Sequence, residues 1–307
     1  MFEETLEHFH DPYPPSEASR GDLIRPVDRM DWRIWRMSGE SRAFSGDVVV
    51  EEPLEIRLNG QPVAVLMRSP GLEKELAVGF CLGEGLIANP RDVALVRHCG
   101  RLHPGPEAEG DPLDVSYNRV DVTLMPAVAA NLDRGGAVPL IRSGCGRTEV
   151  SALLQNLTPV KAQLTMPLET LFHLPAQMTR QQAAYRAAGG IHAAALFDTA
   201  GRAIVVCEDI GRHNAVDKAV GYCLLRDIPL SDKLLASTGR ASYDMVVKGA
   251  RLGVPVIASL SSPTSLAIEL AEALNCTLLG YLRGKTLNVY THGWRIASEG
   301  TNSEDGK

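Results

Sequence analysis

Residues Ala203–Gly221 read AIVVCEDIGRHNAVDKAVG, and this stretch decides how the C-terminal half of the chain folds. The β-branched run Ile204–Val206 is typical of a buried strand, and the apolar spacing after Asn214 is typical of a helix. Gly211 marks the turn between them. Polar side chains gather at this corner, namely Glu208, Asp209, Arg212, His213, Asn214, Asp217 and Lys218. Because ligands bind beyond the carboxyl ends of strands in open α/β sheets, the corner predicts a site for an anionic, hydrogen-bond-rich ligand.

Strands and helices alternate on both sides of this corner. The strands expected in this half are Ala193–Phe197, Ile204–Val206, Lys233–Ser237, Val256–Ser259 and Thr277–Leu282. The expected helices are Gln181–Ala188, one from Asn214, one from Ser242, and Ser265–Leu274. This rhythm predicts an α/β fold with a mainly parallel sheet.

The chain before residue 165 has a different pattern. Leu54–Leu58 alternates with period two, Asn59-Gly60 is a hairpin-turn dipeptide, and Val63–Met67 returns as a second strand. A helical spacing over Glu75–Ile87 and an alternating strand over Arg119–Met125 follow. We therefore expect a mobile acidic, Pro-rich tail (1–30), a smaller β-rich N-terminal region (31–165), a C-terminal α/β domain (166–297) and a short tail (298–307).

The composition excludes several classes of protein. The chain has 307 residues with 45% hydrophobic and 22% charged residues, as a packed globular protein has. Its formal net charge of -6 argues against broad nucleic-acid binding. No apolar run is long enough for a membrane span, and the N-terminus lacks the features of a secretory signal. Six scattered cysteines in a chain with this much core favour a reducing cytoplasm over a disulfide scaffold.

Two loops after successive expected strands carry groups that bind phosphate. They read STGRAS over Ser237–Ser242 and SSPTS over Ser261–Ser265, and each opens a helix. The candidate ligand-binding residues in them are Ser237, Gly239, Arg240, Ser262 and Thr264, and Arg283-Gly284-Lys285 adds a basic element after the last strand. Together the loops suit a nucleotide or pyrophosphate ligand. The absence of a Walker A motif and of GxGxxG disfavours a conventional NTPase or NAD enzyme.

Structural alternatives exist for several of these residues. His192, after paired glycines, is either a ligand or acid/base group, or a hydrogen-bonded histidine at a strand start. His213 and its charged neighbours form either a binding site or an ion-pair network that holds the corner together. Ser242 could simply cap its helix. No His/Cys pair has zinc-ligand spacing, so we expect no metal site.

Cys145 is the candidate nucleophile. It lies in RSGCGRT, where glycines leave the thiol accessible and Arg142 and Arg147 would favour the thiolate. The alternative is a surface loop with an incidental cysteine. The other five cysteines lie in apolar or helical contexts and are expected to be small core residues.

Several segments together resemble the FdhD family of formate dehydrogenase accessory proteins. They are Glu75–Ile87, Ser143–Gly146, Gly189–Leu196, Glu208–Gly221, Ser237–Lys248, Ser261–Ala267 and Gly280–Thr291. The resemblance covers about residues 47–293, and its EDIGRHNAVDK stretch is so long that chance explains it poorly.

The resemblance implies a sulfurtransferase. Members accept sulfur from a cysteine desulfurase as a persulfide and pass it to the bis(molybdopterin guanine dinucleotide) cofactor of molybdenum or tungsten, which formate dehydrogenase requires. The persulfide cysteine falls on Cys145, and the cofactor-binding stretch falls on Tyr281, Leu282, Arg283, Gly284, Lys285 and Thr286. The implied fold is cytidine-deaminase-like, with three layers, a mixed sheet and no zinc, and the implied protein is a cytoplasmic homodimer.

The sequence departs from the family pattern at Thr148, where a second loop cysteine is expected. Persulfide carriage needs one sulfur nucleophile, but a resolving thiol would be missing. In an alternative register Cys145 takes the second position and Arg142 the first. The departure motivates a second hypothesis, a cofactor-binding chaperone that transfers no sulfur. Deaminase-like hydrolysis is a third hypothesis, which rests on fold analogy alone.

Overall fold

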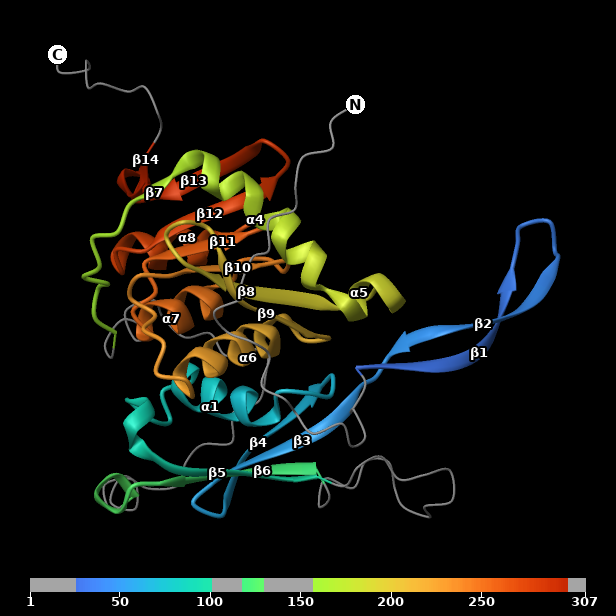
Figure 1. The fold of residues 1–307 in the computed structure, drawn as a ribbon, viewed down its shortest axis with the longest axis horizontal. Coiled ribbons are helices and arrows are strands. Elements are labelled where there is room, and N and C mark those ends of the chain that lie inside the picture. The colour runs from blue at the N-terminus through green and yellow to red at the C-terminus, as the bar shows by residue number, and fades with distance from the viewer. Residues whose placement is uncertain (1–25, 101–117, 130–156, 298–307) are drawn as a thin grey trace, which may run out of the picture.

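The computed structural model describes residues 26–100, 118–129 and 157–297, and Figure 1 shows how their elements are arranged. Cys145 and its loop lie outside these ranges. None of the described helices is both long and apolar enough to cross a lipid bilayer.

The first element is a β-ribbon that the sequence analysis did not predict. Strands β1 (Val27–Trp35) and β2 (Ser41–Val49) pair antiparallel from Val27↔Val49 to Trp35↔Ser41. Regular structure therefore begins within residues 1–30, which were expected to be a tail. Figure 1 shows the ribbon projecting away from the rest of the molecule.

The N-terminal region forms a sheet covered on one face by a helix. Within the described ranges the strand order is β4-β3-β6-β5, with β3 Glu52–Leu58, β4 Gln61–Arg68, β5 Val93–Gly100 and β6 Asn118–Leu124. The predicted hairpin between β3 and β4 is confirmed, because Asn59 and Gly60 both adopt positive φ, at 50° and 79°. Helix α1 (Glu73–Gly83) packs its apolar residues on this sheet.

The C-terminal region is built around a six-stranded sheet, as far as the structure describes it, in the order β13-β12-β11-β10-β8-β9. Its strands are β8 His192–Phe197, β9 Ala203–Asp209, β10 Leu234–Ser237, β11 Val256–Ser259, β12 Thr277–Arg283 and β13 Thr286–Thr291. Each of the five expected strands is present. The expectation of a mainly parallel sheet needs correction, because β8 and β13 run antiparallel to their neighbours. The sheet is mixed since short turns, rather than crossover helices, join β8 to β9 and β12 to β13.

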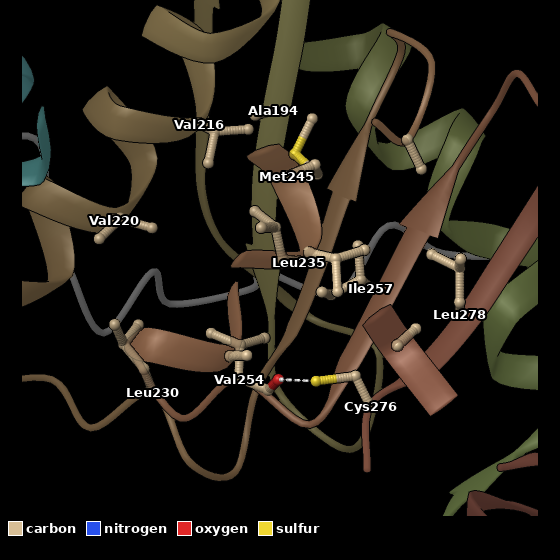
Figure 2. Packing of buried hydrophobic residues seen from close by; sticks show 14 of the residues in the cluster. Ala194, Val216, Val220, Leu230, Leu235, Met245, Val254, Ile257, Cys276 and Leu278 are labelled. Atoms are coloured by element: carbon tan, nitrogen blue, oxygen red, sulfur yellow. Dashed lines mark hydrogen bonds between the residues drawn. The ribbon is translucent and has the colours of Figure 1, made fainter. Parts of the chain in front are cut away.

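Helices cover both faces of this sheet. Helices α6 (Arg212–Leu224), α7 (Tyr243–Arg251) and α8 (Ser265–Ala273) pack on one face, and α4 (Leu168–Gln181) packs on the other. Figure 2 shows part of the first core, which contains the helix residues Val216 and Met245 and the strand residues Leu235, Ile257 and Leu278. The architecture is therefore a three-layer α/β domain. Its likeness to cytidine deaminases stays a prediction.

Short elements complete the fold. They are helix α5 Ala183–Ala188, the small strand pair β7 Met166–Pro167 and β14 Ile296–Ala297, and the 3₁₀ turns η1 Pro90–Asp92 and η3 Gly293–Arg295. The expected helix Gln181–Ala188 is thus divided, since Gln181 ends α4 and α5 begins two residues later.

The two regions meet where α1 crosses α6. A Cβ on Gly79 would lie 2.0 Å from the backbone oxygen of Asp217, and one on Gly221 would lie 1.9 Å from that of Glu75. Glycines at both crossing points therefore let the two backbones touch. This contact fixes the corner of Ala203–Gly221 against the N-terminal region. The expected domain boundary near residue 165 stays a prediction.

Candidate functional site

The sheet register gathers the predicted site residues at one edge. His192 at the start of β8 pairs with Asp209 at the end of β9, and Ala194 pairs with Ser237 at the end of β10. Ser237 in turn pairs with Ser259 at the end of β11. The carboxyl ends of β9, β10 and β11 and the amino end of β8 therefore share an edge, as the sequence predicted for the corner and the loops.

Hydrogen bonds link the loops beyond this edge. The Ser259 hydroxyl donates to the Gly239 carbonyl at 2.7 Å, and the Ala241 N–H donates to the Ser262 carbonyl at 3.2 Å. The Tyr281 N–H donates to the Ser261 carbonyl at 2.8 Å. The β10, β11 and β12 loops thus form one continuous rim. We call the side chains along it, His192, Arg212, His213, Arg240, Tyr281 and Arg283, the strand-end site.

Arg212 lies at the centre of this site. A Cβ on Gly239 would lie 2.8 Å from Cβ of Arg212, so the glycine lets the β10 loop pack on the arginine stem. Among the described residues, Arg212 Nε is buried and has no hydrogen-bond partner. A buried donor without an acceptor is costly, and an incoming anionic oxygen would satisfy it.

The two histidines beside Arg212 are held neutral. Burial lowers the pKa of His192 below its ordinary value, and Arg212 lowers it further. Burial, with Lys248 and Arg212, lowers the pKa of His213 to about 4. His192 Nδ1 lies 3.3 Å from Thr238 Oγ1, and His213 Nε2 lies 3.4 Å from the Ser242 hydroxyl. The Arg212 guanidinium is therefore a cation that acts on two neutral imidazoles, and it favours an anionic ligand.

The pH dependence of the free energy of unfolding should reveal that folded His213 is neutral. We expect the free energy of unfolding to rise with pH from about 4 to 6.5, because below 6.5 the unfolded histidine takes up a proton that the folded one resists. His213→Gln should remove part of this rise. Burial raises the pKa of Asp217 to about 6, which gives the opposite slope, so the difference between the two proteins is the quantity to measure. Urea unfolding over this pH range tests it, and identical pH profiles would contradict it.

The basic residues at the outer rim are exposed. Arg240, Arg283 and Lys285 face solvent, and the Arg283 guanidinium lies 5.3 Å from the centre of the Tyr281 ring. Tyr281 has a φ of 51°, a left-handed conformation that is unusual for an aromatic residue. It occurs at a register shift between β12 and β13, where β12 continues beyond the level of Ser259. The turn of the predicted cofactor-binding stretch therefore projects past the edge of the sheet.

Other predicted site residues make hydrogen bonds or core contacts within the protein. Ser237 Oγ accepts from the Gly239 N–H at 3.1 Å, and Thr264 caps α8 by accepting from the Ala267 N–H at 3.3 Å. The Thr286 hydroxyl donates to the Arg283 carbonyl at 3.2 Å, and Leu282 is buried in the core. Ser242 precedes α7 but makes no capping hydrogen bond, so the capping alternative does not explain its hydroxyl.

The acidic half of the corner faces the N-terminal region instead of the strand-end site. Asp209 and Lys218 are fully buried and pair at 2.7 Å. Asp209 also accepts from the Ser69 N–H at 3.2 Å, and Lys218 donates to the Ser69 carbonyl at 2.8 Å. Asn214 donates to the Met67 carbonyl at 2.8 Å. These side chains anchor the turn between β4 and α1, as in the ion-pair alternative.

Two more corner residues have structural partners. Asp217 accepts two hydrogen bonds from Lys248, at 2.9 and 2.8 Å, and Lys248 also pairs with Glu84 at 3.0 Å. Glu208 accepts from the backbone N–H groups of Ala184 and Tyr185, at 2.9 and 2.8 Å, at the start of α5. The corner therefore divides, with Arg212 and His213 toward the strand-end site and the rest toward packing contacts.

Thr238 and Asp244 were not predicted from the sequence as site residues. The Thr238 hydroxyl contacts His192 and also accepts from the Ala193 N–H at 2.9 Å. Asp244 lies 3.8 Å from His213 Nε2. Thr238 lies within STGRAS, so the loop motif could have suggested it. Asp244 has no such signal, since its proximity to His213 depends on how α7 packs beside α6.

The described cysteines are poor nucleophiles where they are buried. Burial raises the pKa of Cys81, Cys207, Cys223 and Cys276 to about 12, so these thiols stay protonated near neutral pH. They are small core residues, as predicted. Cys99 is partly buried, and its Sγ lies 3.9 Å from Asp121 Oδ2. Among the described residues no three His, Cys, Asp or Glu side chains gather in a way that could hold a metal ion.

Comparison with known proteins identifies a family whose members resemble this chain. Residues 49–297 match the model of the FdhD/NarQ family. A sulfur carrier protein FdhD of Mycobacterium bovis is 43% identical over 256 residues, which cover 81% of this chain and 91% of that protein. One of Saccharolobus solfataricus is 38% identical over 283 residues, covering 91% and 98%.

A solved structure agrees with the fold. The crystal structure of a formate dehydrogenase accessory protein from Desulfotalea psychrophila is 26% identical and superposes with a TM-score of 0.70. The match covers 89% of this chain and 100% of that one. The family match extends across the strand-end site, and with the relatives and the shared fold it shows that this chain belongs to the FdhD/NarQ family.

Proposed function

We propose that this protein is a sulfur carrier for formate dehydrogenase. Cys145 would take sulfur from a cysteine desulfurase and deliver it to the molybdenum or tungsten bis(molybdopterin guanine dinucleotide) cofactor in the cytoplasm. The names of the relatives support the carrier role. The observation that supports the proposal is the strand-end site, where the buried Arg212 and the exposed Arg240 and Arg283 lie along one edge of the sheet.

The proposed chemistry needs one sulfur nucleophile. The Cys145 thiolate attacks the terminal sulfur of the desulfurase persulfide, a new S–S bond forms, and the desulfurase cysteine leaves as a thiolate. When the terminal sulfur passes to the metal centre of the substrate, that S–S bond breaks and Cys145 leaves as the thiolate. The sulfur is transferred at the sulfane level, and the two electrons that would reduce it to a sulfido ligand would come from the reduced metal of the substrate. Arg142 and Arg147 flank Cys145 in the sequence and would stabilise both anionic forms.

The strand-end site fits a guanine-nucleotide-containing substrate. The buried Arg212 Nε needs an acceptor, and the exposed Arg240, Arg283 and Lys285 provide charge for a pyrophosphate. The exposed Tyr281 ring, beside Arg283, offers a face on which a base could stack. The neutral His192 and His213 can donate or accept hydrogen bonds without adding charge.

Mass spectrometry tests the carrier role directly. The protein is incubated with a cysteine desulfurase and cysteine, and its peptides are then analysed. We expect one added sulfur atom at Cys145 that a reductant removes. If Cys145 stays unmodified while the same desulfurase loads another acceptor, the sulfur-carrier proposal is wrong.

The second candidate is a cofactor chaperone without sulfur transfer. Thr148 favours it, because it replaces the second cysteine of the loop. This candidate predicts that Cys145→Ala leaves formate dehydrogenase maturation intact while loss of the rim arginines abolishes it. The two candidates therefore differ in which substitution is tolerated.

Removal of a rim arginine should weaken nucleotide binding. We expect Arg240→Ala and Arg283→Ala each to raise the dissociation constant for GDP about tenfold or more, since a charge-assisted hydrogen bond contributes about 1.5–3 kcal/mol. Calorimetry measures the change. Arg202→Ala is the matched control, because Arg202 is also exposed but pairs with Asp198 in the turn at the other end of β8 and β9. Unchanged GDP affinity in both rim variants would contradict a phosphate-binding role for these loops.

A further inference from the structure

Thr238 makes two hydrogen bonds to the residue that follows His192. The Thr238 N–H donates to the Ala193 carbonyl at 2.9 Å, and the Thr238 hydroxyl oxygen accepts from the Ala193 N–H at 2.9 Å. These bonds continue the pairing of β8 with β10 by one residue beyond Ser237. Thr238 is therefore fixed relative to the start of β8, where His192 lies.

The residues on both sides of Thr238 are also held in place. The Gly239 N–H donates to the Ser237 hydroxyl at 3.1 Å, and the Ser259 hydroxyl donates to the Gly239 carbonyl at 2.7 Å. Gly239 also packs so closely on the stem of Arg212 that a Cβ there would lie 2.8 Å from Cβ of the arginine. Because its neighbours are fixed, the Thr238 side chain keeps one position, as a group that orients another side chain must.

The Thr238 hydroxyl also contacts the imidazole of His192. Thr238 Oγ1 lies 3.3 Å from His192 Nδ1, and the ring makes no second hydrogen bond within the part of the chain that the structure describes. Burial and Arg212 lower the pKa of His192, so near neutral pH only one of its two ring nitrogens carries a proton. The direction of the hydrogen bond with Thr238 decides which nitrogen that is.

The hydroxyl proton of Thr238 has two acceptors within reach. One is the Ala193 carbonyl, 3.4 Å away, which already accepts from the Thr238 N–H at 2.9 Å. The other is His192 Nδ1, which has no other donor among residues 26–100, 118–129 and 157–297. Since the carbonyl is already paired, donation to Nδ1 makes the better use of the proton. It leaves the ring proton of His192 on Nε2.

A proton on Nε2 suits the ligand that the strand-end site is proposed to bind. Arg212 Nε, which is buried and finds no acceptor in the described ranges, favours an anionic oxygen. Beside such an oxygen an Nε2–H group is an attractive donor, whereas the lone pair of a bare Nε2 would repel it. The tautomer that Thr238 sets therefore acts together with Arg212.

His213 is held in a different way. Its Nε2 lies 3.4 Å from the Ser242 hydroxyl and 3.8 Å from Asp244 Oδ2. An ionised carboxylate can only accept a hydrogen bond, so the proton on this nitrogen is directed to groups at the start of α7. His192 is thus the histidine whose donor is left for a ligand.

We propose that Thr238 is a positioning residue of the strand-end site, whose hydroxyl donates to Nδ1 of His192 and so presents Nε2–H to an anionic oxygen of the ligand. Thr238 acts through the imidazole and does not contact the ligand itself. The inference rests on the proposed function for the identity of the ligand, but the tautomer of His192 can be measured without any ligand.

Histidine ¹⁵N NMR of the full chain tests the tautomer, because protonated and bare ring nitrogens have well-separated shifts. The spectrum of His192→Phe assigns the His192 signals by their absence. We expect a bare Nδ1 and a protonated Nε2 in the wild type and in Thr238→Ser, which keeps the hydroxyl. In Thr238→Val, which keeps the shape but loses the hydroxyl, the two signals should move toward the average of both tautomers, while those of His213 stay.

A protonated Nδ1 in the wild type would overturn the proposal, and so would a Thr238→Val spectrum identical to that of the wild type. Thermal unfolding shows whether each variant is folded. If Thr238→Val does not fold, the spectra of the wild type and of Thr238→Ser still decide which nitrogen carries the proton.

Calorimetry with GDP tests whether Thr238 acts through His192. We expect His192→Phe to raise the dissociation constant about tenfold, since it removes one hydrogen bond to a charged group, and Thr238→Val to raise it less. Thr238→Val should add nothing when His192→Phe is already present, whereas additive effects would contradict the positioning role. If the wild type does not bind GDP, the proposed substrate is wrong, and the NMR spectra still decide the role of Thr238.

Discussion

Cys145→Ala is expected to abolish maturation of formate dehydrogenase. The substitution removes the proposed sulfur nucleophile, and the buried thiols of Cys81, Cys207, Cys223 and Cys276 cannot replace it, because burial raises their pKa to about 12. The affinity for GDP should stay unchanged, since the strand-end site is built from other residues. Formate dehydrogenase activity in cells that carry only the variant measures maturation, and calorimetry measures GDP binding.

Cys99→Ala provides the matched control for this experiment. Cys99 lies partly buried on β5, far along the sequence from both Cys145 and the strand-end site. It should support normal maturation. Full maturation with Cys145→Ala would refute Cys145 as the carrier and favour the chaperone candidate. Loss of maturation with Cys99→Ala alone would indicate that Cys99 on β5, and not Cys145, is the nucleophile.

Lys218→Met is expected to lower the free energy of unfolding by about 3–5 kcal/mol, because it leaves the buried carboxylate of Asp209 without its cation. Lys218 Nζ lies 2.7 Å from Asp209 and donates to the Ser69 carbonyl at 2.8 Å and to the Glu208 carbonyl at 3.3 Å. The substitution thus breaks two contacts within the corner and one between the corner and Ser69. Urea unfolding at neutral pH measures the loss.

Lys233→Met is the control for a lysine with a solvent-exposed partner. Lys233 pairs with the neighbouring Asp232, whose side chain is 57% exposed, so its loss should cost about 1 kcal/mol or less. A loss below 1 kcal/mol for Lys218→Met would contradict the anchoring role. If Lys218→Met kept its stability but lost GDP binding, the residue would be a ligand contact, as the sequence suggested.

Local patterns in the sequence were sufficient to predict individual strands and turns. The β-branched run Ile204–Val206 lies within β9, and Asn59-Gly60 forms the hairpin turn because both residues tolerate positive φ. The expected strand Val256–Ser259 matches β11. These features depend on side-chain periodicity and on backbone preferences of single residues, which the sequence contains. Strand direction does not depend on these local features. The expectation of a mainly parallel sheet was therefore wrong.

The ribbon was missed for a related reason. Arg29, Asp31 and Arg33 alternate with Met30, Trp32 and Ile34, as in an amphipathic strand. The segment lay at the border of an acidic, Pro-rich stretch, and no core residue nearby indicated a partner for its apolar face. A search for period two across the whole N-terminal segment could have found it.

The sequence alone determined that polar residues gather at one corner, because their positions after a buried strand and before a helix follow from local periodicity. It could not separate their roles. Asp209 and Lys218 are six or fewer residues from Arg212, yet they face the turn at Ser69 while Arg212 faces the loop at Gly239. That division depends on how α1 crosses α6 and on which strands are neighbours. Long-range packing, not local sequence, decides which charges are buried in pairs and which remain for a ligand.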